Sequence, residues 1–273
     1  MSEALLEVTG LSKHFDGVAA VDNVSFSLQS SETLGIVGES GSGKTTLARC
    51  ILRAMDPDEG MVRFNGNNGW CELQALTESE LVPLRQEMQM VFQDPFSSLN
   101  PRRTVQEILE EPLIIHEIGD KNSRREAVLD ILPRVQLDAD ALTRFPHAFS
   151  GGQRQRIGIA RALILRPKLV VCDESVSALD VSVQAQIINL LEDLQEELGL
   201  TYLFVAHDLS VVHHICDRIL VMYHGRVVEE GPVDEVFNNP QEDYTKLLLS
   251  AIPSPDPDVP LNPMDRKSLN LTS

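Results

Sequence analysis

The sequence predicts an α/β fold built around a parallel β-sheet. Three short runs, at residues 33–37, 168–172 and 202–206, are mostly apolar and are typical of strands buried on both faces of such a sheet. Each run is followed by polar residues, and ligands of open α/β sheets bind at the carboxyl ends of the strands. With 273 residues, the chain is long enough for one large domain or for a domain with a subdomain.

The segment before the first buried run differs in pattern. Residues 5–32 alternate between apolar and polar side chains, which predicts two strands joined by a turn at Asp16-Gly17. We therefore expect an antiparallel β subdomain ahead of the parallel core.

The loop after the first buried run fits the phosphate-binding pattern G-x-x-x-x-G-K-[ST]. Its glycines let the backbone turn tightly so that successive N–H groups face inward, and a helix expected from Thr45 to Ala54 places its positive dipole end there. Lys44 would reach the β- and γ-phosphates, and the Thr45 hydroxyl would complete a Mg²⁺ shell. A glycine-rich turn can also be purely structural, but a strand before it and a helix after it favour nucleotide binding. The candidate binding residues are Gly38, Glu39, Ser40, Gly41, Ser42, Gly43, Lys44, Thr45 and Thr46.

The second buried run ends in Asp173 and Glu174. A carboxylate at this strand end suits a partner of Mg²⁺, held directly or through water, so Asp173 is a candidate metal residue. Glu174 points to the other side and is a candidate base for the attacking water. The alternative is a solvated acidic pair that follows a strand and has no chemical role.

The third buried run is followed by His207. A histidine at a strand end is more often a satisfied structural group than a catalytic one. Here it is the third strand end that carries a group suited to phosphate chemistry, which favours a catalytic role.

A second anion-binding helix start is expected after Ser150. Ser150 is a candidate N-cap, and Gly151-Gly152 would expose backbone N–H groups at the start of a helix that runs to Leu165. One nucleotide site in one small domain has little use for two such helix starts. Two copies arranged head to tail would use both.

Between the first and second buried runs, two further regions are expected. Residues 66–86 are interpreted as a surface excursion, and residues 96–150 as an inserted helical subdomain. Within the insert we expect helices at 105–115 and 124–135, broken at Pro112 and Pro133. After the second run, apolar residues predict a helix over 183–198 that ends at Gly199.

Composition excludes several classes of protein. The chain has 23 basic and 41 acidic residues, a net charge of −18, which argues against a nucleic-acid-binding surface. No stretch approaches 18 consecutive apolar residues and residues 1–30 carry no secretory signal, so we expect no membrane span. The four cysteines lack metal-ligand spacing and are interpreted as reduced core thiols of a cytosolic protein.

Taken together, these motifs resemble the nucleotide-binding domain of an ABC (ATP-binding cassette) transporter. The resemblance covers about residues 5–250, with the family motifs in order. It implies a P-loop NTPase (RecA-like) core with an antiparallel β subdomain and an inserted helical subdomain that carries the signature. The implied domain spans 1–252, with the helical part at about 96–150. The Pro-rich segment 253–273 is expected to be a disordered tail.

The resemblance also implies roles for single residues. Gly38–Thr46 matches the Walker A loop and Leu169–Asp173 the Walker B strand, with Glu174 as general base. Gln93 matches the Q-loop glutamine that touches Mg²⁺ and the water, and His207 the switch histidine that senses the γ-phosphate.

Three further matches complete the implied ATP site. Ser150, Gly151, Gly152 and Gln153 match the signature, although Phe149 replaces the commoner leucine. Ser177–Asp180 matches the D-loop, which makes Asp180 a candidate binding residue. Phe15 stands where the family has an aromatic residue, usually tyrosine, that stacks on adenine, but an aromatic residue there is more often part of a core. The implied cofactors are ATP and Mg²⁺, with Thr45, Gln93 and Asp173 around the metal.

Other segments resemble oligopeptide and dipeptide importers. Residues 92–102, 145–147 and 175–186 match that group, as does the C-terminal segment 240–253. Where the group usually has His-Pro-Tyr, this chain has Glu242-Asp243-Tyr244. Some members carry a cysteine cluster after this segment, but this chain has no cysteine beyond Cys216, so we expect no iron–sulfur site.

The resemblance implies an ATP-hydrolysing subunit that energises a membrane importer, for oligopeptides or dipeptides or else for nickel, glutathione or another small solute. The implied partners are integral membrane permease subunits, a second cassette in a head-to-tail dimer and, indirectly, a solute-binding protein, at the cytoplasmic face of the plasma (inner) membrane. Two alternatives stay open: a non-transport ABC ATPase acting on ribosomes or DNA, and a nucleotide-regulated subunit with little hydrolysis. Relatives of the first kind usually have two cassettes or long coiled-coil insertions, and this chain has neither.

Overall fold

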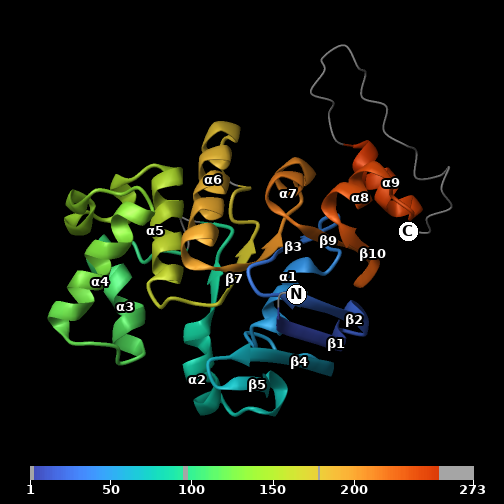
Figure 1. Ribbon diagram of the computed structural model, residues 1–273, viewed down its shortest axis with the longest axis horizontal. Coiled ribbons are helices and arrows are strands. Elements are labelled where there is room, and N and C mark those ends of the chain that lie inside the picture. The colour runs from blue at the N-terminus through green and yellow to red at the C-terminus, as the bar shows by residue number, and fades with distance from the viewer. Residues whose placement is uncertain (1–2, 95–97, 178, 252–273) are drawn as a thin grey trace.

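Two β-sheets organise the protein. The computed structural model describes residues 3–94, 98–177 and 179–251 (Figure 1). The antiparallel sheet has the order β2-β1-β4-β5 and the larger sheet the order β10-β9-β3-β8-β7-β6. The antiparallel sheet consists of β1 (Ala4–Phe15), β2 (Val18–Gln29), β4 (Glu59–Gly66) and β5 (Gly69–Glu72). The larger sheet consists of β3 (Thr33–Val37), β6 (Met88–Val91), β7 (Leu169–Asp173), β8 (Thr201–Val205), β9 (Arg218–Tyr223) and β10 (Arg226–Pro232).

Helices cover the larger sheet and extend beyond its β6 edge. In Figure 1, α5, α6 and α7 lie along one side of this sheet, while α1 lies between it and the antiparallel sheet. Helices α3 and α4 stand apart on the left, and α8 and α9 lie next to β10. The helices are α1 (Lys44–Ile51), α2 (Glu78–Glu87), α3 (Val105–Ile115), α4 (Lys121–Arg134), α5 (Gly151–Leu163), α6 (Val181–Leu198), α7 (Leu209–Ile215), α8 (Val233–Asn238) and α9 (Asp243–Ser250). Short 3₁₀ turns occur at Leu73–Ala75, Ala139–Thr143 and Pro146–Ala148.

The predicted fold class is confirmed. Strands β3, β7 and β8 pair in parallel with their neighbours, and all their residues are buried. The first strand has its predicted bounds, and the other two are displaced by one residue. The β1–β2 hairpin turns at Asp16 and Gly17, as predicted, and both residues have a positive φ.

The interpretation of residues 66–86 as a surface excursion was wrong, because part of this segment belongs to the antiparallel sheet. Strand β5 pairs antiparallel with β4, with Gly66 opposite Gly69 and Arg63 opposite Glu72. The turn needs a positive φ, which Gly69 adopts at 87°. The segment therefore widens the antiparallel sheet before α2 returns the chain to β6.

The prediction that two helices break at proline was also wrong. Helix α3 continues for three residues past Pro112, and α4 includes Pro133. Proline removes one N–H donor, but Leu113 directly after Pro112 is 3% exposed and packs in the core. Burial of that side chain offsets the lost hydrogen bond. The helix expected from Thr45 to Ala54 is shorter, since it ends at Ile51.

The core has two parts, one on each face of the larger sheet. One contains Leu34 and Ile36 of β3 with α1 and the antiparallel sheet, and the other contains Val37 with α5, α6 and the helices of the insert. Cys50, Cys172 and Cys216 are buried free thiols, as the sequence indicates, and burial raises the pKa of Cys172 to about 12. The predicted tail at 253–273 lies outside the described residues.

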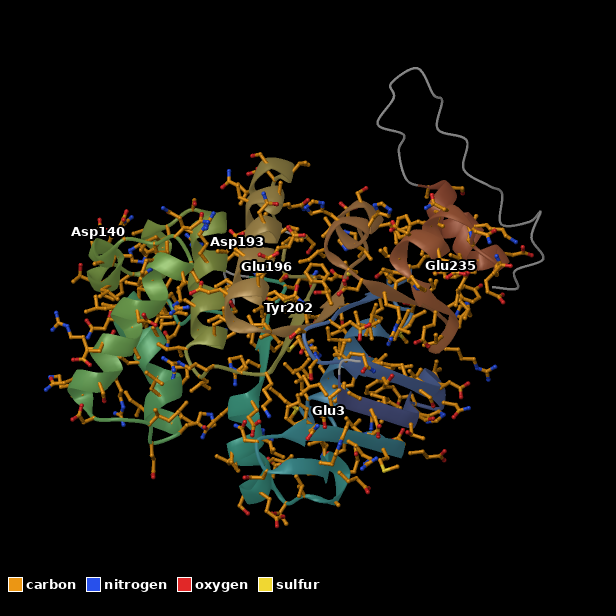
Figure 2. The ribbon with its side chains drawn as sticks, in the orientation of Figure 1. Glu3, Asp140, Asp193, Glu196, Tyr202 and Glu235 are labelled. Carbon is orange, nitrogen blue, oxygen red and sulfur yellow. The ribbon has the colours of Figure 1, made fainter. Side chains whose placement is uncertain are left out.

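Acidic side chains are spread over the surface. Asp140, Asp193, Glu196, Glu235 and Glu3 are all exposed; Asp193 and Glu196 share α6, and the other three lie on separate parts of the molecule (Figure 2). These five acidic side chains therefore do not form one patch.

Candidate functional site

The glycine-rich loop joins β3 to α1 and is tightly enclosed. Gly38 and Gly43 have φ values of 149° and 104°. A Cβ on Gly38 would lie 2.2 Å from the Met222 carbonyl oxygen, and one on Gly43 would lie 2.0 Å from the Ala20 carbonyl oxygen. Both positions need glycine, because backbone atoms of β9 and β2 occupy the space of a side chain. Ser40, Gly41 and Thr46 complete the loop and the first turn of α1.

Lys44 is held inside this loop. Its ammonium donates to the carbonyl oxygens of Gly38 and Glu39, both at 2.8 Å, and the residue is 4% exposed. Burial lowers the pKa of Lys44 from its usual value, although nearby carboxylates act in the other direction. A buried cation bound by neutral oxygens alone is well placed to bind an anion.

The interior of the loop also fits a phosphate group. The Ser42 hydroxyl is buried and has no hydrogen-bond partner. The Gly225 N–H donates to the Ser42 carbonyl oxygen at 3.0 Å, which fixes the loop against the β9–β10 turn. An unsatisfied hydroxyl beside a buried ammonium and a helix N-terminus matches the donors that phosphate oxygens require.

Thr45 and Asp173 form the candidate metal pair. The Thr45 hydroxyl donates to Asp173 Oδ1 at 3.0 Å, so the structure joins two of the predicted metal residues. Asp173 is 5% exposed, and burial raises the pKa of its carboxyl group, opposed by the bond from Thr45. In the described part of the chain, no three His, Cys, Asp or Glu side chains gather as a metal cluster. One carboxylate with a hydroxyl and phosphate oxygens suits Mg²⁺, which keeps several waters.

Glu174 lies between the two other predicted catalytic residues. Gln93 Nε2 donates to Glu174 Oε2 at 2.6 Å, and His207 Nδ1 lies 3.6 Å from the same oxygen. The three residues follow β6, β7 and β8, so the parallel sheet brings them to one edge. The structure thus joins residues that are far apart in the sequence.

The backbone at Glu174 is unusual. Its φ is 46°, a left-handed conformation that is rare for a residue other than glycine. The Glu174 N–H donates to the Val205 carbonyl oxygen at 2.9 Å, and its own carbonyl oxygen accepts from the Ser177 hydroxyl at 2.9 Å. Strain that is held in place by surrounding bonds often marks a functional site, and here it aims the carboxylate at Gln93 and His207.

The segment Ser150–Gln153 lies at the start of α5, apart from the 38–46 loop and Glu174. Ser150 caps α5 by accepting from the Gln153 N–H, and the Gln153 side chain accepts in return from the Ser150 N–H. A Cβ on Gly152 would lie 2.5 Å from Val183, so this helix start packs on the start of α6. Asp180, which accepts from the Val183 N–H, caps α6. Ala178 of the predicted D-loop lies outside the described residues, as do residues 95–97 of the segment after Gln93.

Phe15 ends β1 and is 44% exposed. It is not a core residue, and the Lys13 ammonium lies 5.8 Å from its ring centre. An exposed ring at this position can accept a flat base on its face. Its role in adenine binding stays a prediction.

Two contacts of the site were not found from the sequence. The Glu39 N–H donates to the Tyr244 hydroxyl oxygen at 3.0 Å, across 205 positions in the chain. Gln184 Nε2 donates to the carbonyl oxygens of Val176 and Leu179, which holds the segment after Glu174. Tyr244 belongs to a segment matched to the peptide importers, but no residue pattern linked it to the loop.

Comparisons with known proteins agree with the geometry. The family model described as "ABC transporter" matches residues 21–177, and the model "Oligopeptide/dipeptide transporter, C-terminal region" matches residues 228–270. The chain is 51% identical over 272 residues to the oligopeptide transport ATP-binding protein OppF of Bacillus subtilis, covering 98% of this chain and 88% of that protein. It is 52% identical over 259 residues to a putative peptide import ATP-binding protein of Brucella ovis, covering 93% and 80%.

Solved structures of similar proteins share the fold. CbiO1 from Clostridium perfringens, described as part of the ABC transporter complex cbiONQ, has a TM-score of 0.78 at 28% identity, covering 87% of this chain and 92% of that one. The ATP-binding cassette MJ0796, solved as a dimer in a post-hydrolysis state with ADP and Pi, has a TM-score of 0.73 at 31% identity, covering 84% and 99%. Among the described residues, no helix is both long and apolar enough to cross a membrane.

Proposed function

Because the chain belongs to the ABC transporter family, among the ATP-binding subunits of oligopeptide and dipeptide import systems, we propose that it hydrolyses Mg-ATP at the 38–46 loop to energise peptide import. The observation that carries this assignment is the convergence of Lys44, Asp173 and Glu174 at one edge of the parallel sheet. Gln93 and His207 lie around the same carboxylate.

Each residue has a distinct part in the proposed reaction. The loop amides and Lys44 bind the β- and γ-phosphates, and the exposed ring of Phe15 stacks on the adenine. Thr45, Gln93 and Asp173 would hold Mg²⁺, which neutralises charge on the phosphate oxygens when bound. Glu174 accepts a proton from the attacking water, and His207 donates a hydrogen bond to the transferring phosphoryl group.

The second helix start supports a two-cassette assembly. Ser150–Gln153 packs on the start of α6, while Lys44 and Thr45 lie at the start of α1. We propose that this segment and Asp180 complete the ATP site of a second cassette in a head-to-tail dimer, either another copy or a paralogue. Such an arrangement uses both anion-binding helix starts.

A groove between the core and the helical insert supports a membrane partner. It has a volume of about 710 Å³ and is lined by residues of α1, α2, β6, α3 and α5. Phe92 and Ile115 in its lining are 45% and 64% exposed, and Arg161 lies 5.8 Å from the Phe92 ring. We propose that a permease subunit docks here, next to Gln93, and that residues 96–150 act as the helical subdomain of a domain spanning 1–252. The proposal implies a position at the cytoplasmic face of the plasma membrane, with a solute-binding protein as an indirect partner and no nucleic acid.

Two substitutions test the proposed chemistry. Glu174→Gln should keep ATP binding and lower steady-state hydrolysis about 10²–10³-fold, because the amide cannot accept the proton. Lys44→Ala should weaken nucleotide binding itself. The matched control is Glu192→Gln, which removes a half-buried carboxylate of α6 that lies 3.5 Å from His214 and outside the site. Hydrolysis by Glu174→Gln within threefold of the unaltered chain would refute Glu174 as the base, and an unchanged ATP dissociation constant for Lys44→Ala would refute the loop assignment.

A further inference from the structure

The C-terminal helix α9 reaches the phosphate loop through one side chain. Tyr244 is 3% exposed, and its hydroxyl oxygen accepts the Glu39 N–H at 3.0 Å. Its ring packs against Tyr223 at the end of β9, with ring centres 4.2 Å apart. The hydroxyl is therefore held in position by a buried ring, and the loop amide binds to a fixed group.

This hydrogen bond acts on the same peptide group that holds Lys44. The peptide between Gly38 and Glu39 contributes its C=O to the Lys44 ammonium at 2.8 Å and its N–H to Tyr244. Because a peptide group is planar, the direction of the N–H fixes the direction of the C=O. Gly38 has no Cβ and its φ is 149°, so no side chain at this position resists rotation of the peptide.

Helix α9 is also held by contacts away from the loop. Glu229 of β10 accepts the backbone N–H groups of Gln241 and Glu242, at 2.7 and 3.1 Å, just before the helix begins. Lys246 then donates to the Gln241 carbonyl oxygen at 2.9 Å. The helix is thus anchored on the larger sheet and supports the loop from outside.

We propose that Tyr244 is a positioning residue for nucleotide binding, which gives the C-terminal segment a direct part in setting the affinity of the phosphate loop. The proposal rests on the proposed function of that loop. With the hydroxyl in place, the Gly38–Glu39 peptide keeps the orientation in which Lys44 and the loop amides face the phosphates. Without it, the Glu39 N–H turns to find water and the nucleotide-free loop leaves this orientation.

A merely structural bond would behave differently. If the loop kept its shape without the hydroxyl, the unpaired N–H would cost the same free energy with and without nucleotide. Stability would fall but the dissociation constant would not change. Affinity falls only when the empty loop rearranges and binding must reverse the rearrangement.

Tyr244→Phe removes the hydroxyl and keeps the ring, and Tyr202→Phe is its matched control. Tyr202 lies in β8 (Figure 2), and its buried hydroxyl donates at 3.0 Å to the carbonyl oxygen of Leu191, which belongs to α6 and not to the loop. Both variants should lower the thermal unfolding midpoint. Only Tyr244→Phe should raise the ATP dissociation constant and the KM, by about three- to tenfold, with kcat within twofold of the unaltered chain.

The outcomes separate the two proposals. ATP binding by Tyr244→Phe equal to that of the unaltered chain, or an equal rise in both variants, overturns this inference and leaves the proposed function standing. No ATP binding by the unaltered chain overturns the proposed function and this inference with it. If Tyr244→Phe fails to fold, hydrogen exchange of the Glu39 amide in the unaltered chain tests the inference instead. The inference requires slow exchange without nucleotide, and fast exchange overturns it.

Discussion

Gly43→Ala should destabilise the protein before any nucleotide is bound. The new Cβ would lie 2.0 Å from the Ala20 carbonyl oxygen, 1.4 Å inside the 3.4 Å of ordinary contact. Ala20 lies in β2 between Ala19 and Val21, which pair with His14 and Lys13 of β1, so its backbone is held on both sides and cannot move aside easily. The φ of Gly43 is 104°, which an L side chain rarely adopts.

The expected cost has two parts. A left-handed backbone costs a residue other than glycine about 1–2 kcal/mol. Overpacking against a fixed neighbour costs about 1–3 kcal/mol. Gly43→Ala should therefore lower the free energy of unfolding by about 2–5 kcal/mol.

Gly41→Ala in the same loop separates the two parts. Gly41 also has a positive φ, at 82°, but no atom lies within 4 Å of a Cβ built there. It should lose only about 1–2 kcal/mol, the backbone part. Urea unfolding of the two variants without nucleotide gives the difference, provided that their m values agree. Equal losses for Gly43→Ala and Gly41→Ala would refute the account of a loop enclosed by β2.

Two further predictions concern the metal residue and the groove. Burial raises the pKa of Asp173 above its ordinary 3.8, so its charged form opposes folding at neutral pH and this cost disappears as pH falls through the raised pKa. Asp173→Asn should raise the unfolding midpoint of the metal-free protein at pH 7 and lower Mg²⁺-dependent hydrolysis by about 10²-fold. A lower midpoint would contradict the expectation that the charge of Asp173 destabilises the folded protein. Ile115→Cys in the groove should crosslink to a permease subunit more strongly with ATP, whereas crosslinks only from the control Leu198→Cys on α6 would count against docking there.

The parallel core was predictable because its strands are buried on both faces. Such strands read as short apolar runs, and the carboxyl ends of parallel strands share one edge, so Asp173, Glu174 and His207 could be placed together in advance. Helix α3 was less predictable at Pro112. Proline disfavours a helix interior, but the burial of Leu113 stabilises the last turn of this helix. Helix propensity fails to predict the helix where tertiary packing contributes more free energy than the local preference.

Contacts between distant segments could not be predicted from the sequence. The resemblance gave Gln93 a role, but the 2.6 Å bond from Gln93 to Glu174 joins positions 81 residues apart. The bond from Glu39 to Tyr244 depends on where α9 is anchored, and that anchor is a carboxylate of β10, at Glu229. Neither contact follows from spacing or periodicity, since each needs the complete fold.

The role in peptide import is tested by purifying the tagged Glu174→Gln chain with Mg-ATP from gently solubilised membranes of cells that produce it, and by identifying its companions by mass spectrometry. We expect integral membrane permease subunits together with a second cassette, retained with ATP and reduced when Lys44→Ala is combined with Glu174→Gln. Recovery of ribosomal or DNA-associated companions, or of the chain alone, would contradict the assignment to peptide import.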